Sequence, residues 1–188
     1  MRAVVVNEFG PIDSHKVEEF DAPTPGKGEV LIDVHAIGLN YPDILMLQGK
    51  YQSKPDRPFV PGRDVAGIVS GIGEGVTRVK VGDRVAAPLR FGGYAEQAVG
   101  PEMRVYKIPD NLDFIPAAGM VTIYCTAHVG LMTRGQYGQY RPNENVLVLG
   151  ATGGVGLAAI QIAKAKGATV IAGVSSPEKG ELAKASGA

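Results

Sequence analysis

The stretch that decides the fold reads VLVLGATGGVGLAAIQIA and spans residues 146–163. It carries no charge over about the length of a bilayer crossing, but its glycines stand at the middle, where a spanning helix would be weakest. A buried strand at 146–149, a glycine turn at 150–156 and a helix at 155–166 explain it better than a membrane span.

The residues that follow continue this alternation of strand and helix. A strand is predicted at 169–174, and a second helix opens at Pro177. Strands that alternate with helices in this way predict a parallel sheet. Upstream, residues 117–132 have helical spacing, and a polar stretch follows at 134–144.

The first 108 residues are predicted to be mostly β, with one short helix. The expected strands lie at 3–6, 30–36, 65–69, 79–85, 94–99 and 105–108, and the segment 79–85 is expected to hold a turn at Gly82 and Asp83. Their short spacing favours a barrel or a sandwich. Pro42 suits the first turn of the interrupting helix, and Gly49 ends it.

Composition restricts the class of protein. The chain has 188 residues, with 19 basic and 19 acidic side chains, so no basic surplus points to nucleic acid or to an anionic membrane. The single cysteine, Cys125, cannot form an internal disulfide or a cysteine-rich zinc site. The N-terminal apolar run is too short for a signal peptide, so we predict a cytoplasmic protein.

The glycine turn is predicted to bind a dinucleotide. Its residues are Gly150, Ala151, Thr152, Gly153, Gly154, Val155 and Gly156. A pyrophosphate lies against backbone N–H groups at a helix N-terminus, and side chains there would block it. Strand, turn, helix and second strand stand at the required spacing. The alternative is a tight turn that binds nothing.

The end of the second strand favours NADP(H) over NAD(H). NAD sites usually carry an acidic residue there, but this strand runs into Ser175 and Ser176. These hydroxyls, together with Lys179, are candidates to hold a 2′-phosphate. Glu178 is the competing acid, although it falls in the first turn of the next helix. Ser176 also suits a helix cap, which is compatible with phosphate binding.

Five motifs together resemble one family, the zinc-independent quinone oxidoreductase branch of the medium-chain dehydrogenase/reductase superfamily. They are GLNYPD at 38–43, PGRDVAG at 61–67, VGDRV at 81–85, GGYAE at 92–96 and GGVGL at 153–157. The resemblance implies an α/β plus β fold. A GroES-like β-barrel domain, which contributes the substrate site, would span 1–118, and the first half of a Rossmann-type, NADP-binding parallel-sheet domain would span 119–188.

The resemblance also implies which residues act. Zinc-dependent members have metal ligands where this chain has Asn40 and Arg63, so no metal is expected. Asn40 and Tyr51 match catalytic residues of the branch. Asn40 is also expected to bind the cofactor near the nicotinamide ribose or amide, and Thr126 matches a threonine near the nicotinamide. The plainer alternatives are that Asn40 only caps a helix and that Tyr51 is ordinary loop packing. A second tyrosine of many relatives is replaced by Leu45, which makes the pocket less polar.

The function that follows is NADPH-dependent hydride transfer to quinones or other α,β-unsaturated carbonyl compounds. The alternatives are a trans-enoyl thioester reductase of the same fold and a non-catalytic NADP-binding or scaffold protein. Relatives are longer and usually dimerise, so the resemblance implies a homodimer at full length. The chain stops where a third parallel strand is expected, after residues 186–188. We therefore expect a part of a longer polypeptide or a truncated product with little reductase activity.

Overall fold

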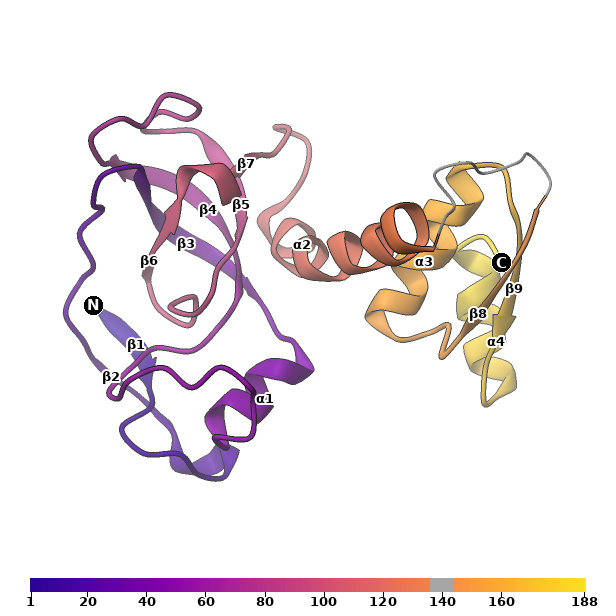
Figure 1. The fold of residues 1–188 in the computed structure, drawn as a ribbon, viewed down its shortest axis with the longest axis horizontal. Coiled ribbons are helices and arrows are strands. Elements are labelled where there is room, and N and C mark those ends of the chain that lie inside the picture. The colour runs from indigo at the N-terminus through magenta and orange to yellow at the C-terminus, as the bar shows by residue number, and fades with distance from the viewer. Residues whose placement is uncertain (136–143) are drawn as a thin grey trace. The chain divides into compact units, whose positions relative to one another are not determined.

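The computed structural model describes residues 1–135 and 144–188 (Figure 1). Most of the polar stretch predicted at 134–144 therefore lies outside the described residues. The chain separates into two compact units, Met1–Val121 and Thr122–Ala188.

The division between the units falls inside a single helix, α2 (Phe114–His128). The boundary predicted at 118/119 falls in the same helix, and the assignment of the two domains stays a prediction. A π-helical turn, η3 (Val129–Arg134), follows directly.

Unit 1 is built on an antiparallel sheet. Its strands are β1 (Arg2–Val5), β2 (Lys16–Glu19), β3 (Glu29–Gly38), β4 (Asp64–Ile72), β5 (Arg84–Pro88), β6 (Gln97–Pro101) and β7 (Tyr106–Lys107). Five of them pair in the order β6-β3-β4-β5-β7, and β1 pairs with β2. Two short 3-10 turns, η1 (Ile12–Ser14) and η2 (Glu102–Arg104), connect them.

The core of the sheet follows the predicted alternation along β3. Val30 and Ile32 are fully buried and pack with Val65 and Val69 of β4 and with Val85 of β5. These β-branched side chains suit a pleated surface that is buried on one face. The antiparallel pairing holds this packed face across the three central strands.

Helix α1 (Tyr41–Leu47) interrupts the strands between β3 and β4, as predicted. Asn40 is its N-cap, and Pro42 lies in its first turn, where a missing N–H costs nothing. The chain leaves the helix at Gly49, whose φ of +66° is a conformation that glycine adopts without strain. The helix therefore begins directly beside the end of β3.

Two expectations for the strands of unit 1 are corrected. The segment 79–85 contains the turn predicted at Gly82 and Asp83, so its strand begins only at Arg84. Gly82 adopts a φ of +92°, and Asp83 accepts a hydrogen bond from the Lys80 N–H at 2.9 Å. These contacts close a turn. Strand β2 was not expected at all, since each of its side chains is exposed and it shows no apolar pattern.

Unit 2 has the predicted order of strand, helix, strand and helix. Its elements are β8 (Asn145–Leu149), α3 (Gly154–Ala165), β9 (Thr169–Gly173) and α4 (Pro177–Ala185). Strands β8 and β9 are parallel, as expected from the connecting helix. Val146, Val148 and Val170 face a core that includes Ile160 of α3. The stretch at 146–163 is thus a strand, a turn and a helix.

Among the described residues, one helical segment is long and apolar enough to cross a membrane by length and composition alone. It is Phe114–Arg134, which combines α2 and η3. Ala117 and Ala118 within it are fully buried and pack against Ala66 of β4. Core helices of soluble proteins meet the same description, and the cytoplasmic location stays a prediction.

Candidate functional site

Asn40 is held at both its backbone and its side chain. Its backbone N–H donates to Asp43 Oδ2 at 2.9 Å, which satisfies one of the free donors at the start of α1. Its side-chain Nδ2 donates to Asp64 Oδ2 at 3.0 Å, across to the first residue of β4. Asn40 is therefore the N-cap of α1, while its side-chain amide is oriented by Asp64 of β4.

The contact with Asp64 fixes which way the Asn40 amide points. Asp64 is only 1% exposed, and a carboxylate accepts hydrogen bonds but does not donate them when ionised. The amide nitrogen must therefore face Asp64. An amide nitrogen carries two hydrogens, so one goes to Asp64 and the second remains a donor for another oxygen.

Tyr51 is linked to the same part of the sheet through Arg63. The guanidinium Nη1 of Arg63 donates to the Tyr51 hydroxyl oxygen at 2.9 Å. A phenol that accepts through its oxygen keeps its own proton as a donor. Because Arg63 and Asp64 are neighbours in the chain, the start of β4 holds both predicted catalytic residues.

A cavity of about 600 Å³ lies beside Asn40. Its polar walls are Asn40, Asp43, Tyr94, Tyr41 and His15. The rest of its lining is apolar: Val4, Ile12, Ile37, Leu39, Ile44 and Leu47. Such a site suits an apolar ligand that presents one or two polar atoms.

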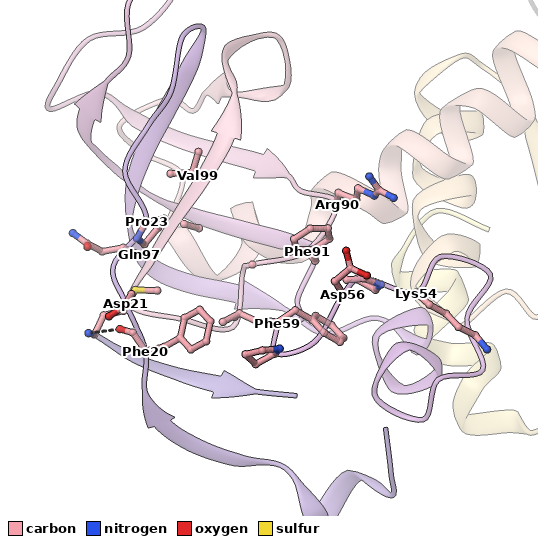
Figure 2. Close-up of a pocket in the computed structure, with 16 residues that line it drawn as sticks. Phe20, Asp21, Pro23, Lys54, Asp56, Phe59, Arg90, Phe91, Gln97 and Val99 are labelled. Carbon is pink, nitrogen blue, oxygen red and sulfur yellow. Dashed lines mark hydrogen bonds between the residues drawn. The ribbon is translucent and has the colours of Figure 1, made fainter. Parts of the chain in front are cut away.

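A second cavity, of about 520 Å³, lies elsewhere in unit 1 and is lined by none of the predicted site residues. Figure 2 shows its labelled lining residues, among them Phe20, Phe59, Phe91, Lys54, Arg90, Asp21 and Asp56. Side chains of both charge signs surround its aromatic rings. This mixture does not select one class of ligand.

Two buried groups beside Asn40 were not predicted as functional residues. The Tyr94 hydroxyl donates to Asp43 Oδ2 at 3.0 Å, and Asp43 is 2% exposed. Burial raises the pKa of the Asp43 carboxyl, while the bonds from Asn40 and Tyr94 oppose that rise. Burial, and then the nearby Asp43, raise the pKa of the Tyr94 phenol. Both residues, like Asp64, lie within the motifs by which the sequence resembles the family, and this was the signal in the sequence that could have identified them.

In unit 2, the glycines of the turn have different surroundings. Gly150 adopts a φ of +62°, which favours glycine. A Cβ on Gly156 would lie 2.5 Å from the Gly150 carbonyl oxygen, so helix and strand require glycine there. A Cβ on Gly153 would meet only that same oxygen, at an ordinary 3.5 Å. The fold of the turn therefore does not explain Gly153.

The other predicted cofactor residues lie at the start of α3 and, in the case of Thr126, on α2. Gly153 is the N-cap of α3, with Thr152 before it and the 41% exposed Val155 in the first turn. A Cβ on Gly154 would meet Ile123 of α2 at 3.3 Å. Thr126, also on α2, donates through its hydroxyl to the Thr122 carbonyl at 2.7 Å.

The predicted phosphate residues gather at the start of α4. Lys179 Nζ donates to Ser175 Oγ at 2.9 Å, and Ser176 Oγ caps the helix by accepting from the Lys179 backbone N–H at 3.4 Å. The Ser176 hydroxyl holds the pKa of the Glu178 carboxyl below its usual range. Three of the predicted residues thus lie together at an exposed helix N-terminus.

Asn40, which is predicted to serve both catalysis and cofactor binding, lies in unit 1 together with Tyr51, whereas the other predicted cofactor residues lie in unit 2. Within residues 1–135 and 144–188, no three His, Cys, Asp or Glu side chains gather closely enough to hold a metal ion. The expectation that no zinc is bound stays a prediction.

Comparison with known proteins finds a matching domain family and several similar proteins. The alcohol dehydrogenase GroES-like domain family matches residues 26–110. Human quinone oxidoreductase is 41% identical over 183 residues, which cover 96% of this chain and 54% of that protein. The rat synaptic vesicle membrane protein VAT-1 homolog is 36% identical over 189 residues, which cover 100% of this chain and 46% of that protein.

Solved structures agree with these matches. The Escherichia coli quinone oxidoreductase complexed with NADPH has a TM-score of 0.89 at 31% identity, covering 100% of this chain and 57% of that chain. A native mycobacterial quinone oxidoreductase has a TM-score of 0.91 at 36% identity, with coverage of 100% and 57%. These likenesses confirm the predicted fold class, and the chain spans about half the length of the curated relatives it matches.

Proposed function

The chain belongs to the quinone oxidoreductase branch of the medium-chain dehydrogenase/reductase superfamily, and from this premise we propose that it serves NADPH-dependent hydride transfer to quinones or other α,β-unsaturated carbonyl compounds. In this reaction the hydride goes to the acceptor, a pair of electrons moves onto the carbonyl oxygen, and a proton from the medium completes the product. The enzyme must bind an apolar acceptor and stabilise the negative oxygen.

One observation carries the proposal: Asn40, whose side-chain amide donates to Asp64, lines a mostly apolar cavity. Asp64 takes one of its two hydrogens, so the second can donate to the oxygen on which charge develops. A donor that is already oriented does not have to reorganise during the reaction, which is where such groups gain their effect. Tyr51 accepts from Arg63 and keeps its own hydroxyl hydrogen, so it is the second proposed donor, although it is not among the residues that line this cavity.

The glycine turn fits the cofactor. When bound, NADPH supplies the hydride from its nicotinamide ring. The space at Gly153 supports a pyrophosphate against the N-terminus of α3, because the free N–H groups of a helix start attract an anion and no side chain stands in the way. Gly150, Thr152, Gly154, Val155 and Gly156 would complete this contact, and Thr126 would lie near the nicotinamide.

A preference for NADPH over NADH is proposed from the start of α4. Lys179 and Ser175 already share a hydrogen bond, and Ser176 stands beside them at the cap. A 2′-phosphate would find a cation, two hydroxyls and a helix N-terminus there. Glu178 is the competing acid: the Ser176 hydroxyl stabilises its ionised form, so a 2′-phosphate would have to draw Ser176 away from this carboxylate.

Independence from zinc is also proposed. Asn40 and Arg63 occupy the positions at which zinc-dependent relatives of the resembled family carry ligands, and an amide and a guanidinium are poor ligands for zinc. Metal analysis should find no tightly bound zinc, and one zinc per chain would contradict the proposal. The homodimer and the cytoplasmic location stay predictions.

The experiment is an assay of NADPH oxidation by the complete gene product, with a quinone, an enone and an enoyl thioester as acceptors. We expect turnover with the quinone or the enone. Faster turnover with the enoyl thioester would favour the thioester reductase. NADPH that binds but is not oxidised by any acceptor would favour a non-catalytic binding protein.

A further inference from the structure

The GGYAE motif at 92–96 has no part in the proposed chemistry, yet its tyrosine reaches the site. Tyr94 is 9% exposed, and its hydroxyl donates to Asp43 Oδ2 at 3.0 Å. The two residues are 51 positions apart in the chain, so the bond joins the loop before β6 to the first turn of α1. A buried bond to a carboxylate is among the stronger hydrogen bonds in proteins.

The same carboxylate oxygen also holds Asn40. Asp43 Oδ2 accepts from the Asn40 backbone N–H at 2.9 Å, while the Asn40 side chain is held by Asp64 at 3.0 Å. One oxygen therefore ties Tyr94 to the backbone of the proposed donor. Three separate motifs, GLNYPD, PGRDVAG and GGYAE, meet around this one asparagine.

Tyr94 is itself fixed in place. Its backbone N–H donates to the Pro61 carbonyl at 2.9 Å, and its carbonyl accepts from the Val4 N–H at 2.8 Å. Gly62, with a φ of +93°, allows the ring to pass, because a Cβ there would overlap Tyr94 Cδ1. The ring thus reaches Asp43 from a backbone anchored on both sides, and its hydroxyl has little freedom to move elsewhere.

We propose that Tyr94 is a positioning residue for the hydride-transfer reaction, and that its hydroxyl acts through Asp43 to hold Asn40 against the cavity wall. This inference rests on the proposed function. Tyr94 also lines the cavity of about 600 Å³, but the hydroxyl bond that is present leads to Asp43.

Charge gives the inference a second, independent readout. The titratable groups around Asp43 are Tyr94, Asp64 and Arg63, and His15 lines the same cavity. Burial raises the pKa of Asp43, and the bond from Tyr94 lowers it. Removing the Tyr94 hydroxyl therefore raises the pKa of Asp43, so that the carboxyl becomes protonated at a higher pH.

The test is Tyr94→Phe in the complete gene product, with Tyr106→Phe, an exposed tyrosine on β7, as the matched control. We expect kcat of Tyr94→Phe to fall about tenfold, since a small displacement of an oriented group is costly, while KM for NADPH is unchanged. The acid limb of its pH–rate profile should move to higher pH. Tyr106→Phe should match the wild type in all three quantities.

Several results would overturn the inference. One is Tyr94→Phe with the kcat and the pH profile of the wild type; another is a variant that only melts at a lower temperature and keeps its kcat per folded molecule. If Tyr94→Phe does not fold, Asp43→Ala, which removes the oxygen that accepts from both Tyr94 and Asn40, takes its place and should show the same fall in kcat. An unchanged kcat in that variant would count equally against the inference.

The inference can fail separately from the proposed function. The proposed function fails if none of the acceptors supports NADPH oxidation by the wild type. The placement of Asn40 is then read from the NMR signals of its side-chain amide in the whole chain. These signals should shift in Tyr94→Phe and not in Tyr106→Phe, and equal spectra of the two variants would contradict the role of Tyr94.

Discussion

Two glycines of the nucleotide turn serve different purposes, and alanine at each position separates them. A Cβ on Gly156 would lie 2.5 Å from the Gly150 carbonyl oxygen and 2.8 Å from main-chain atoms of Ala151. These backbone atoms cannot move aside cheaply, so overpacking should cost about 3 kcal/mol. Alanine is favoured over glycine in a helix by about 1 kcal/mol, which leaves a loss of about 2 kcal/mol in the free energy of unfolding.

Gly153→Ala should leave stability almost unchanged. The residue has a φ of −73° and a ψ of 162°, which alanine adopts freely, and its Cβ would make only an ordinary contact. Losing glycine at the N-cap costs about 0.5 kcal/mol, and the less flexible unfolded chain returns about as much. The new methyl group would stand where the pyrophosphate is proposed to lie, so NADPH affinity should fall at least about tenfold.

Urea unfolding followed by circular dichroism measures the first quantity, and fluorescence titration with NADPH measures the second. Equal destabilisation by the two alanines would show that Gly153 is required by the fold. The reasoning would also fail if Gly153→Ala both unfolded like the wild type and bound NADPH as tightly.

Three further predictions concern single side chains. Lys179→Ala should weaken NADPH binding about tenfold in titration calorimetry and leave NADH binding unchanged. Lys184→Ala, on the same helix, should change neither affinity, and equal losses of affinity for both nucleotides in Lys179→Ala would refute a phosphate contact. Asn40→Ser keeps a good helix cap but removes the amide, so kcat should fall about a hundredfold; Asn7→Ser, at an exposed site, is the control, and equal activities would remove Asn40 from the chemistry. Burial raises the pKa of Asp43 in the folded chain above its value in the unfolded chain. The protonated carboxyl therefore favours the folded state, fully so below about pH 4, and this stabilisation is lost as the pH rises through the folded pKa. Asp43→Asn should therefore gain stability relative to the wild type as the pH rises from about 4 to 7 in urea unfolding, and parallel pH curves would contradict the buried charge.

Local signals were enough to predict the start of unit 2. The glycine turn, the Pro177 that opens α4 and the β-branched strand between them act within a few residues of each other, and the parallel pair β8–β9 follows from the connecting helix. The same holds for α1, which Pro42 and Gly49 delimit. Fold class was therefore accessible from the sequence alone.

Contacts between distant residues were not accessible in this way. Strand β2 has no apolar pattern and exists because it pairs with β1. The bond from Tyr94 to Asp43 and the bond from Asn40 to Asp64 join residues that no periodicity connects. The sequence supplied these residues as members of motifs, while their arrangement around Asn40 required the three-dimensional packing.

The most direct measurement of the central claim is the fate of the transferred hydrogen. The complete gene product is incubated with an enone and NADPH that carries deuterium at the transferable position of nicotinamide C4, and the reduced product is analysed by mass spectrometry and NMR. Hydride transfer predicts one deuterium at the β-carbon of the product, with a proton from the solvent at the neighbouring carbon. A reduced product that is free of deuterium, or no reduced product although NADPH binds, would contradict the account.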